Sequence, residues 1–193
     1  MASKLTLIIP TLGRSTLSRA VRSATRYMGP DDQVIVVGDG PLGIGDQVAE
    51  DGGLYVEIPV RVGDYGCTPC DLAMNIASGD YVFFLGDDDL CVGDAFDIIR
   101  EAVEEKPGVP HLFSMLHTGV RLGGTLECSR VSGQQIVVPR DMTRMPKMAD
   151  CPPNALGVSD WVFIVKVCKE WGKVVFHDDI IAILPVMNQG KML

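Results

Sequence analysis

The 193-residue chain lacks the features that mark several classes of protein. No apolar stretch approaches the roughly 20 residues that a membrane helix needs, and the short apolar run near the start stops at Pro10, unlike a secretory signal. Charged residues make up 22% of the chain and apolar residues 47%, a balance that disordered chains do not have. We therefore expect one globular domain over residues 1–193, no membrane span and a cytoplasmic location.

The chain also lacks a complete set of metal-binding cysteines. Only Cys67 and Cys70 are closely spaced, in the stretch CTPC, and no second pair completes a zinc ribbon. Two interpretations of this pair stay open: a thioredoxin-like redox pair, or reduced thiols at the start of a helix.

Acidic residues are absent from residues 1–30, which hold five basic residues, although the whole chain has a net charge of −8. The net charge argues against general nucleic-acid binding. Within the basic segment, Arg19, Arg22 and Arg26 are spaced three and four apart, so they share one face of a helix. This stripe is either a solvated face or a surface that meets an anionic substrate or polymer.

The distribution of apolar residues predicts an α/β fold. Up to residue 109, short apolar runs alternate with segments of helical spacing. The expected strands are 5–10, 33–38, 54–60 and 80–85, and the expected helices are 15–28, 70–78 and 93–106. This alternation predicts a parallel sheet wrapped by helices, with the carboxyl ends of the strands along one edge, where open α/β sheets bind ligands.

After residue 109 the pattern predicts shorter, partly antiparallel strands. A loop rich in proline and methionine is expected over 139–157, and a helix over 159–171. The expected strands of this part are 111–117, 124–130, 134–139, 173–177 and 180–185.

Three adjacent carboxylates, Asp87, Asp88 and Asp89, directly follow the apolar run YVFFL and Gly86. One pair of like charges at about 4 Å costs roughly 4 kcal/mol at an effective dielectric constant of about 20. The cluster is therefore either a solvated turn or the site of a divalent cation, which converts the repulsion into ligation. Pro10 and Asp39 also follow predicted strands, so we expect them to converge with the cluster, and this favours a ligand site.

Four stretches of the chain resemble, in their order, the GT-A glycosyltransferases, and most closely those of family 2. They are LTLIIPTLGR, VIVVGDGP, MNIASGDYVFFLGDDD and SDWVF, and the resemblance runs from residue 4 to about residue 184. It implies a Rossmann-like, mostly parallel central sheet flanked by helices, with a small and partly antiparallel C-terminal part. It also implies a nucleotide-sugar-binding half over 1–109 and an acceptor and catalytic half over 110–193.

The resemblance implies a divalent metal, Mn²⁺ or Mg²⁺, that holds the diphosphate of a nucleotide sugar. By position, Asp87 and Asp89 are the implied ligands, with Asp88 and Asp89 as the alternative pair, and the late His177 is an implied further ligand. The residues implied to contact the nucleotide sugar are Pro10, Thr11, Gly13, Arg14, Asp39, Asn75, Asp87 and Asp88.

Two positions depart from the family pattern. Gly38 stands where the family has the first Asp of Asp-Asp-Gly-Ser, and Met74 stands where it has the Arg of Ala-Arg-Asn. Without that arginine, the charge of the diphosphate must be met by the metal or by another cation. The basic side chains available for this are Arg14, Arg140, Arg144 and Lys147, the last three in a segment that either closes over the donor or is simply a solvated loop.

The resemblance further implies an inverting transfer of the sugar to an acceptor hydroxyl. An alcohol is a weak nucleophile at neutral pH, so a positioned base is needed. The implied base is Asp160, at the start of the helix over 159–171, where the helix dipole is expected to keep it ionised; a role as helix cap is the alternative. Gln134 and Gln135 are expected to face the acceptor, and Trp161 either stacks on the acceptor or packs in the core.

Other functions remain open at this point. Gly38 and Met74 are consistent with a degraded protein that only binds a nucleotide or a sugar. A sugar-nucleotide nucleotidyltransferase needs a richer glycine loop than PTLGRSTLSRA. We expect a shallow acceptor site, open or completed by a second subunit in a homo-oligomer, for a saccharide or another macromolecule; a modified DNA base, which must flip out of a duplex, is one option.

Overall fold

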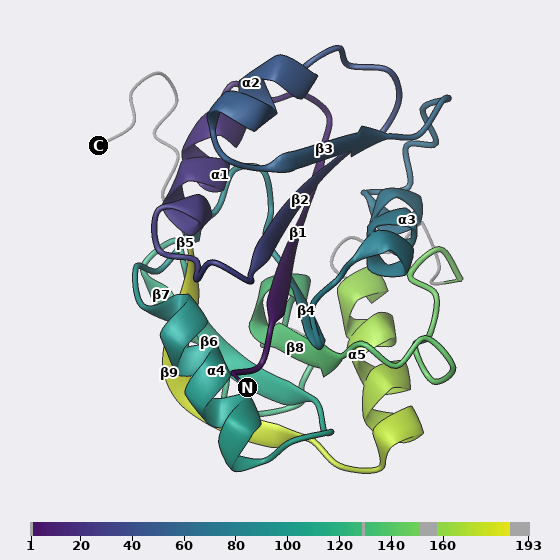
Figure 1. Ribbon diagram of the computed structural model, residues 1–193. Helices are drawn as coiled ribbons and strands as arrows, with labels where there is room; N and C mark the ends of the chain where they lie inside the picture. Colours follow the sequence, from purple (N-terminus) through teal and green to yellow (C-terminus); the bar gives the residue numbers. More distant parts are fainter. Residues whose placement is uncertain (1, 129, 151–157, 186–193) are drawn as a thin grey trace.

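The computed structural model describes residues 2–128, 130–150 and 158–185, and nine strands in this part form one sheet (Figure 1). The helices are α1 (Leu17–Thr25), α2 (Gly45–Glu50), α3 (Cys67–Ile76), α4 (Ala95–Glu105) and α5 (Val158–Trp171), with a 3₁₀ turn η1 (Gly133–Gln135). The strands are β1 (Leu5–Thr11), β2 (Gln33–Gly38), β3 (Leu54–Glu57), β4 (Tyr81–Phe84), β5 (Leu90–Cys91), β6 (His111–His117), β7 (Val120–Leu122), β8 (Ile136–Pro139) and β9 (Val175–Leu184).

The first four strands of the sheet, in the order β3-β2-β1-β4, are all parallel. In the register of the central strands, Ile8 of β1 lies between Ile35 of β2 and Phe84 of β4. These strands are apolar along nearly their whole length because helices cover both faces of the sheet. The predicted α/β architecture is confirmed, and the ends of its predicted helices are within about three residues of the observed ones.

Beyond β4 the sheet continues as β8-β6-β9-β5 with mixed direction: β8 is antiparallel to β4 and β6, and β9 is parallel to β6. The predicted strand over 124–130 is wrong, because its described residues form a bend and a turn. The strand that follows β6 is β7, reached through Thr118 and Gly119, which both have positive φ as a two-residue hairpin turn requires. The strands expected at 173–177 and 180–185 form one continuous strand, β9.

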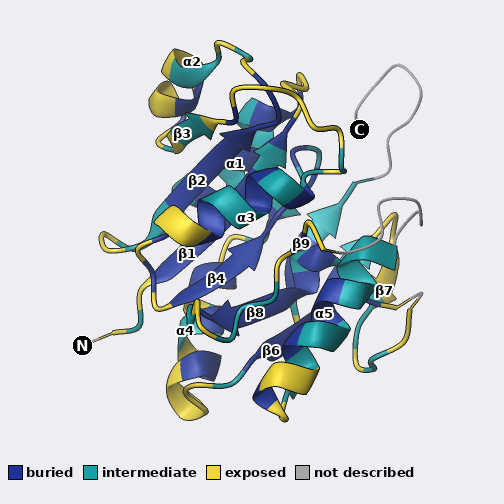
Figure 2. Ribbon diagram, turned by 90° about the vertical axis from the view of Figure 1, so that its right-hand side faces the viewer, coloured by how far each residue is buried: buried dark blue, intermediate teal, exposed yellow. Residues whose placement is uncertain are grey.

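Alternate residues of the parallel strands enter two cores. Leu5, Leu7 and Ile9 pack under α1, α2 and α4, whereas Ile8 packs under α3 and α5. Edge-to-face aromatic pairs join strand to helix on each side, with ring centroids 5.3 Å apart for Phe83 and Phe96 on α4, and 5.9 Å for Phe84 and Phe163 on α5. Figure 2 shows the strands buried beneath α3 and α5, whose outer faces are more exposed. The sheet is therefore held rigidly from both faces.

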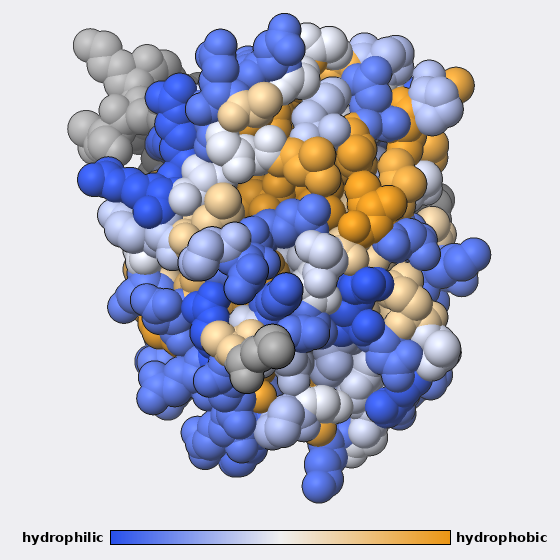
Figure 3. All heavy atoms as spheres, viewed as in Figure 1, coloured by the Kyte–Doolittle hydropathy of each residue, from blue (hydrophilic) through white to orange (hydrophobic). Residues whose placement is uncertain are grey.

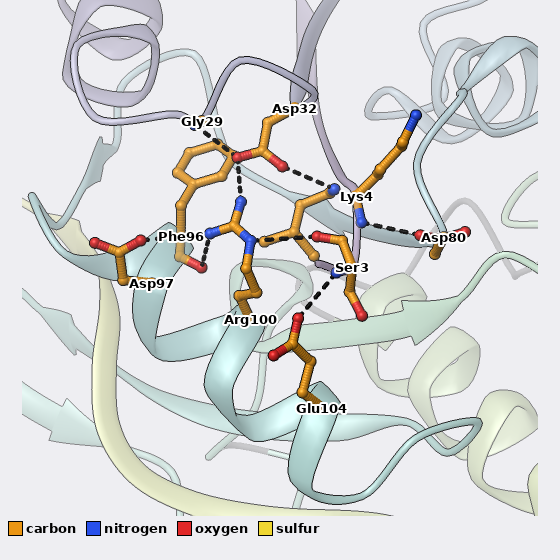
Figure 4. A network of polar contacts seen from close by, with 10 residues as sticks. Ser3, Lys4, Gly29, Asp32, Asp80, Phe96, Asp97, Arg100 and Glu104 are labelled. Carbon is orange, nitrogen blue, oxygen red and sulfur yellow. Dashed lines mark hydrogen bonds and ion pairs between the residues drawn. The ribbon is translucent and has the colours of Figure 1, made fainter. Parts of the chain in front are cut away.

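A polar network ties the first residue of β1 to α4 (Figure 4). The Asp32 carboxylate accepts hydrogen bonds from the backbone N–H groups of Leu5 (3.0 Å) and Gly29 (2.7 Å) and from Arg100 Nη2 (2.5 Å). Arg100 also donates to the carbonyls of Ser3 and Phe96, both at 3.3 Å. This network fixes the position of β1, at whose other end the site described below begins.

The edge of the sheet at β3 is apolar on its outside. Figure 3 shows hydrophobic side chains gathered over β3, and the exposed apolar residues in and after this strand include Leu54, Val60 and Val62.

No helix in the described part of the chain combines the length and apolar character that crossing a membrane requires. The expected homo-oligomer stays a prediction.

Candidate functional site

The carboxyl ends of β2, β1 and β4 lie side by side and surround a cavity of about 400 Å³. The structure thus brings together the strand-end residues that the sequence placed far apart. The lining residues are Pro10, Thr11, Leu12, Arg14, Asp39, Arg61, Gly63, Tyr65, Gly66, Gly86, Asp87 and Asp88. We call this space the donor cavity.

The three aspartates occupy a tight turn that begins at Gly86. The N–H of Asp89 donates to the Gly86 carbonyl (3.1 Å), and the N–H of Gly86 donates back to Asp89 Oδ2 (3.1 Å). A Cβ atom at Gly86 would lie 2.6 Å from Asp89 Oδ2, so any other residue here would force the Asp89 carboxylate to move. The turn buries Asp87 and Asp89 and leaves Asp88 partly exposed.

Side chains from the end of β1 and the loop after it hold Asp87 and Asp88. Thr11 Oγ1 donates to Asp87 Oδ2 (2.7 Å) and accepts a hydrogen bond from the N–H of Gly13 (2.9 Å). Arg14 Nη1 lies 3.2 Å from Asp87 Oδ1 and 2.7 Å from Asp88 Oδ2. The guanidinium therefore bridges the two carboxylates.

Asp89 is 1% exposed and incompletely satisfied. Its Oδ2 atom accepts a hydrogen bond from Gln134 Nε2 (2.7 Å), while Oδ1 is buried without a hydrogen-bond partner in the described part of the chain. Burial raises the pKa of Asp89 to about 6, although the bond from Gln134 acts in the opposite direction. A buried carboxylate oxygen without a partner costs free energy unless a bound proton or cation interacts with it.

The cluster fits a divalent cation that shares its ligands with a substrate. Among residues 2–128, 130–150 and 158–185, no three His, Cys, Asp or Glu side chains are grouped closely enough to hold a metal by themselves. Mg²⁺, however, is usually held by one or two carboxylates together with water and substrate phosphates. Two carboxylates meet here: Asp89, with a partnerless Oδ1 atom, and Asp87, whose oxygens are held by Thr11 and Arg14. Their number matches that ligand set.

His177 does not join this cluster. Its Nε2 atom lies 2.9 Å from Nδ1 of His111, and its ring stacks on Phe113 with centroids 4.4 Å apart. Burial lowers the pKa of His177, and the charges of Asp179 and Glu105 oppose this. The implied role as a metal ligand is therefore corrected: β9 continues through His177, which lies within the strand instead of at a strand end. The histidine whose charge acts on Asp89 is His117.

Asp39 shapes the far wall of the donor cavity. Its two carboxylate oxygens accept hydrogen bonds from the backbone N–H groups of Val62 (2.7 Å) and Gly63 (2.9 Å), so they hold the loop after β3. At the preceding position, a Cβ atom on Gly38 would lie 2.6 Å from the Tyr55 hydroxyl. A side chain at this position would therefore require the Tyr55 ring to move.

Asn75 is not part of the cavity. It is exposed, and its Nδ2 atom donates to the carbonyl of Asp71 within the same helix (2.8 Å). Helix α3 points its first residue, Cys67, toward the site, and Asn75 lies eight residues later, about 12 Å along the helix axis. The expected contact of Asn75 with the nucleotide is corrected accordingly.

A second cavity of about 150 Å³ adjoins the donor cavity and contains Asp160. The two cavities share Pro10, Tyr65, Gly66 and Gly86. Asp160, in the first turn of α5, accepts a hydrogen bond from the N–H of Gly133 at Oδ2 (2.9 Å). Burial raises the pKa of Asp160, and the bond from Gly133 opposes this. That the helix start keeps Asp160 ionised at neutral pH stays a prediction.

The 3₁₀ turn η1 links the two parts of the site. Gly133 donates to Asp160, and the next residue, Gln134, donates to Asp89. Ser132 and Gln135 form a capping box that fixes this turn, and Gln135 Nε2 donates to the carbonyl of Phe113 (3.1 Å). Gln135 is buried and does not face an acceptor, contrary to expectation, whereas Gln134 lines the second cavity.

The basic residues after β8 are directed elsewhere. Arg140 Nε donates to the Gly79 carbonyl (3.3 Å), and the Arg144 guanidinium lies 4.5 Å from the centre of the Trp171 ring. Neither these two residues nor Lys147 lines the donor cavity, whose basic residues are Arg14 and Arg61. Arg61 was not among the expected site residues, although it is a basic residue that directly follows the predicted strand over 54–60. Residues 151–157, the end of the expected loop, lie outside the described residues.

Two further expectations concern the second cavity. Cys67 and Cys70 line it, and burial raises the pKa of the Cys70 thiol, which lowers the share of reactive thiolate and favours ordinary thiols over a redox pair. Trp161 packs against the core beneath α3 and α5, as the core alternative stated.

The arginine stripe lines a separate hollow of about 970 Å³ between α1, the end of α2 and β5, which we call the basic hollow. Within it, Arg22 forms an ion pair with Asp51, and the Arg26 guanidinium lies 5.6 Å from the centre of the Tyr27 ring. The hollow begins at Ser15, the residue after Arg14. It is larger than the donor cavity, but volume alone does not identify a reaction site.

No protein-family model and no curated protein sequence matches the chain. Solved structures match its fold. TarS of S. aureus in complex with UDP-GlcNAc superposes with a TM-score of 0.74 at 16% identity, covering 98% of this chain and 60% of that one. The TarS complex with UDP gives a TM-score of 0.75 at 16% identity over 95% and 60% of the two chains.

The mannosyltransferase PcManGT from Pyrobaculum calidifontis, in complex with GDP-Man and Mn²⁺, matches with a TM-score of 0.72 at 16% identity, covering 98% of this chain and 59% of that one. The chain thus spans 60% or less of the length of these proteins. The likeness confirms the predicted GT-A fold.

Proposed function

We propose that the chain is a glycosyltransferase that moves a sugar from a nucleoside diphosphate to an acceptor hydroxyl with the help of a divalent metal and with inversion at the anomeric carbon. The observation that carries this proposal is the arrangement of two adjoining cavities, one with the carboxylate cluster and one with Asp160, joined by η1. The nucleotides and nucleotide sugars bound in proteins of the same fold support this class of donor.

The donor cavity would hold the nucleoside diphosphate. Asp87 and Asp89 are the proposed ligands of Mn²⁺ or Mg²⁺, with Thr11 orienting Asp87. When bound, the metal supplies positive charge that stabilises the leaving diphosphate. Arg14 and Arg61 face the same space and add two further positive charges. Asp39 acts indirectly, by holding the loop of Val62 and Gly63 against the cavity.

Asp160 is the proposed base. Gly133 holds Oδ2, which leaves Oδ1 to accept the proton of the acceptor hydroxyl. A carboxylate with a raised pKa binds a proton more strongly, so burial makes Asp160 a better base as long as the pH keeps it ionised. A single displacement of the diphosphate by the hydroxyl inverts the anomeric carbon.

The acceptor is proposed more broadly, as a saccharide or another macromolecule. The basic hollow favours an anionic polymer, including DNA, because Arg19, Arg22 and Arg26 line it together. The alternatives are a protein that binds a nucleotide or a sugar without catalysis, and a sugar-nucleotide nucleotidyltransferase. A cytoplasmic location stays a prediction.

Binding of nucleotide sugars to the wild type with and without Mn²⁺ tests the proposal. A sugar derivative of UDP or GDP at 100 times its dissociation constant should stabilise the fold by about 2.7 kcal/mol in thermal unfolding. Asp89→Asn should lose this metal-dependent stabilisation, whereas Asp31→Asn, on an exposed residue outside the site, should keep it. Equal affinity in EDTA would rule out the metal, and metal-dependent binding without hydrolysis or transfer would favour the non-catalytic alternative.

A further inference from the structure

Arg14 occupies the side of the aspartate cluster that faces the donor cavity. Thr11 holds Oδ2 of Asp87, and Arg14 lies 3.2 Å from the other oxygen, Oδ1. The same guanidinium nitrogen lies 2.7 Å from Asp88 Oδ2. Both oxygens of Asp87 are therefore engaged, and a divalent cation that approaches Oδ1 meets a positive charge already in place.

The contact of Arg14 with the two carboxylates is more exposed than a structural ion pair, so Arg14 can exchange them for another anion. Its side chain is 53% exposed, whereas the Arg100 side chain in the network at the other end of β1 is 19% exposed and also bonded to two carbonyls. A planar guanidinium fits a phosphate as well as it fits a carboxylate. Since Arg14 lines the donor cavity, a diphosphate bound there offers it a second anionic partner at short range.

On the basis of the proposed function, we propose that Arg14 is a counter-cation that changes its anionic partner when ligands bind. In the empty site it neutralises Asp87 and Asp88, and when metal and nucleoside diphosphate bind together it passes from the carboxylates to the diphosphate.

This exchange couples the two ligands. A metal that binds alone must displace Arg14, which then has no anionic partner of equal strength. A nucleoside diphosphate that binds alone must either compete for Arg14 or face the negative cluster. When both bind, the metal takes the carboxylates and Arg14 takes the diphosphate. Each ligand should therefore strengthen the binding of the other by the same factor, of about fivefold or more.

The test measures Mn²⁺ binding by electron paramagnetic resonance without nucleotide, and UDP and GDP binding by calorimetry with saturating Mn²⁺. Arg14→Gln should bind Mn²⁺ alone about fivefold or more tightly than the wild type does, yet bind UDP or GDP with Mn²⁺ about fivefold or more weakly. A variant that merely damages the site weakens the binding of Mn²⁺ alone as well as the binding of the nucleotide. Arg14→Lys keeps the charge without the planar guanidinium, so both of its affinities should lie between those of the wild type and those of Arg14→Gln.

Arg61→Gln is the matched control because it removes the same charge from the same cavity. It should raise the affinity for Mn²⁺ alone by less than about twofold, since the interaction of charges that are farther apart is screened by water and salt. Melting curves verify that each variant is folded.

Two results would overturn the inference while leaving the proposed function intact. In one, the wild type binds UDP or GDP with Mn²⁺, but Arg14→Gln does not tighten the binding of Mn²⁺ alone. In the other, Arg61→Gln tightens it equally, which indicates a general effect of charge. If the wild type binds neither nucleotide in the presence of Mn²⁺, the proposed function fails and the inference fails with it.

Discussion

The two ends of β1 carry the same residue types in opposite roles. At its start, Asp32 pairs with Arg100, and both carboxylate oxygens of Asp32 accept hydrogen bonds, two of them from backbone N–H groups (Figure 4). At its end, Arg14 pairs with Asp87 and Asp88 at the rim of a cavity, and Asp89 nearby keeps one buried oxygen without a partner in the described chain. The first network is complete, whereas the second is incomplete.

The difference lies in where the partners come from. Backbone N–H groups have fixed positions once the strands have formed, so a carboxylate that they satisfy contributes to stability. Side chains that face a cavity can exchange one partner for another, so the carboxylates they contact can bind a ligand. The chain thus tolerates an unfavourable arrangement at one end of β1, as functional sites commonly require.

The largest expected effect comes from breaking the complete network. Asp32→Ala should lower the free energy of unfolding by about 3 kcal/mol, the lower end for a broken buried pair, because Arg100 keeps some contact with solvent. Chemical denaturation measures this. Asp97→Ala, which removes the exposed partner of Arg100, should change stability by less than about 0.5 kcal/mol.

The stability of Asp89→Asn, measured by the same chemical denaturation, tests the incomplete cluster in the same way. Asparagine keeps an oxygen for the bond from Gln134 but removes the buried charge. The folded state raises the pKa of Asp89 to about 6, so its ionisation opposes folding as the pH rises from about 4 through 6. At pH 7 without metal, Asp89→Asn should therefore be as stable as the wild type or more stable. A loss as large as that of Asp32→Ala would contradict the distinction between the two clusters.

The second largest effect concerns Asp160, a site carboxylate for which the structure gives one hydrogen bond, from Gly133. Asp160→Asn should lower the rate of transfer about 10²-fold or more, while donor binding and the melting temperature stay nearly unchanged. Ser159→Ala, at the same helix start, is the control and should retain the rate. Near-normal turnover in Asp160→Asn, or a product with retained anomeric configuration, would overturn the assignment.

The pH dependence of transfer provides a separate test of Asp160. The base must be ionised, so activity should rise with pH through its pKa and be lost as the pH falls through it. Because burial raises this pKa, the acid limb should lie above the ordinary range of an aspartate, near 3.9. A limb at or below that range would contradict the burial of the carboxylate in the working enzyme.

The smallest effect is expected in the basic hollow, where a third Asp–Arg contact, between Arg22 and Asp51, is also incomplete: Asp51 Oδ2 has no hydrogen-bond partner in the described part of the chain. With a single-stranded DNA oligonucleotide, the double variant Arg19→Gln, Arg26→Gln should reduce the slope of log affinity against log salt by about 1 to 2. Arg22 is kept so that Asp51 stays paired.

Arg121→Gln, which removes a half-exposed arginine outside the hollow, should leave that slope unchanged. If the wild type shows no salt-dependent binding of DNA at low ionic strength, the nucleic-acid acceptor is ruled out.

Much of the fold was predictable because it depends on local patterns. Apolar strands that alternate with amphipathic helices give a parallel sheet, and parallel strands bring their carboxyl ends to one edge. For that reason Pro10, Asp39 and Asp87 were expected to meet, and they line one cavity. The hairpin at Thr118 and Gly119 carried a local signal as well, but it was overlooked in favour of a strand over 124–130.

Predictions that carried a family position onto a single residue were less secure. His177 follows an apolar run, yet the run continues as β9, and this places the ring beside His111 instead of Asp89. Asn75 lies on the expected helix, but α3 presents its first turn to the site and Asn75 is two turns away. Both errors arise because the packing of whole elements decides which end of a strand or helix reaches the cavity.

The sequence by itself determined the α/β class, the alternation of strands and helices in the first half apart from the short α2 and β5, and the position of the acidic turn at a strand end, since these follow from spacing along the chain. Tertiary structure alone decided the partner of each carboxylate. Thr11 and Asp87 are 76 residues apart, and Gln134 and Asp89 are 45 apart, so no local pattern links them. Burial, which raises the pKa values of Asp89 and Asp160, likewise exists only once the sheet and its helices have packed together.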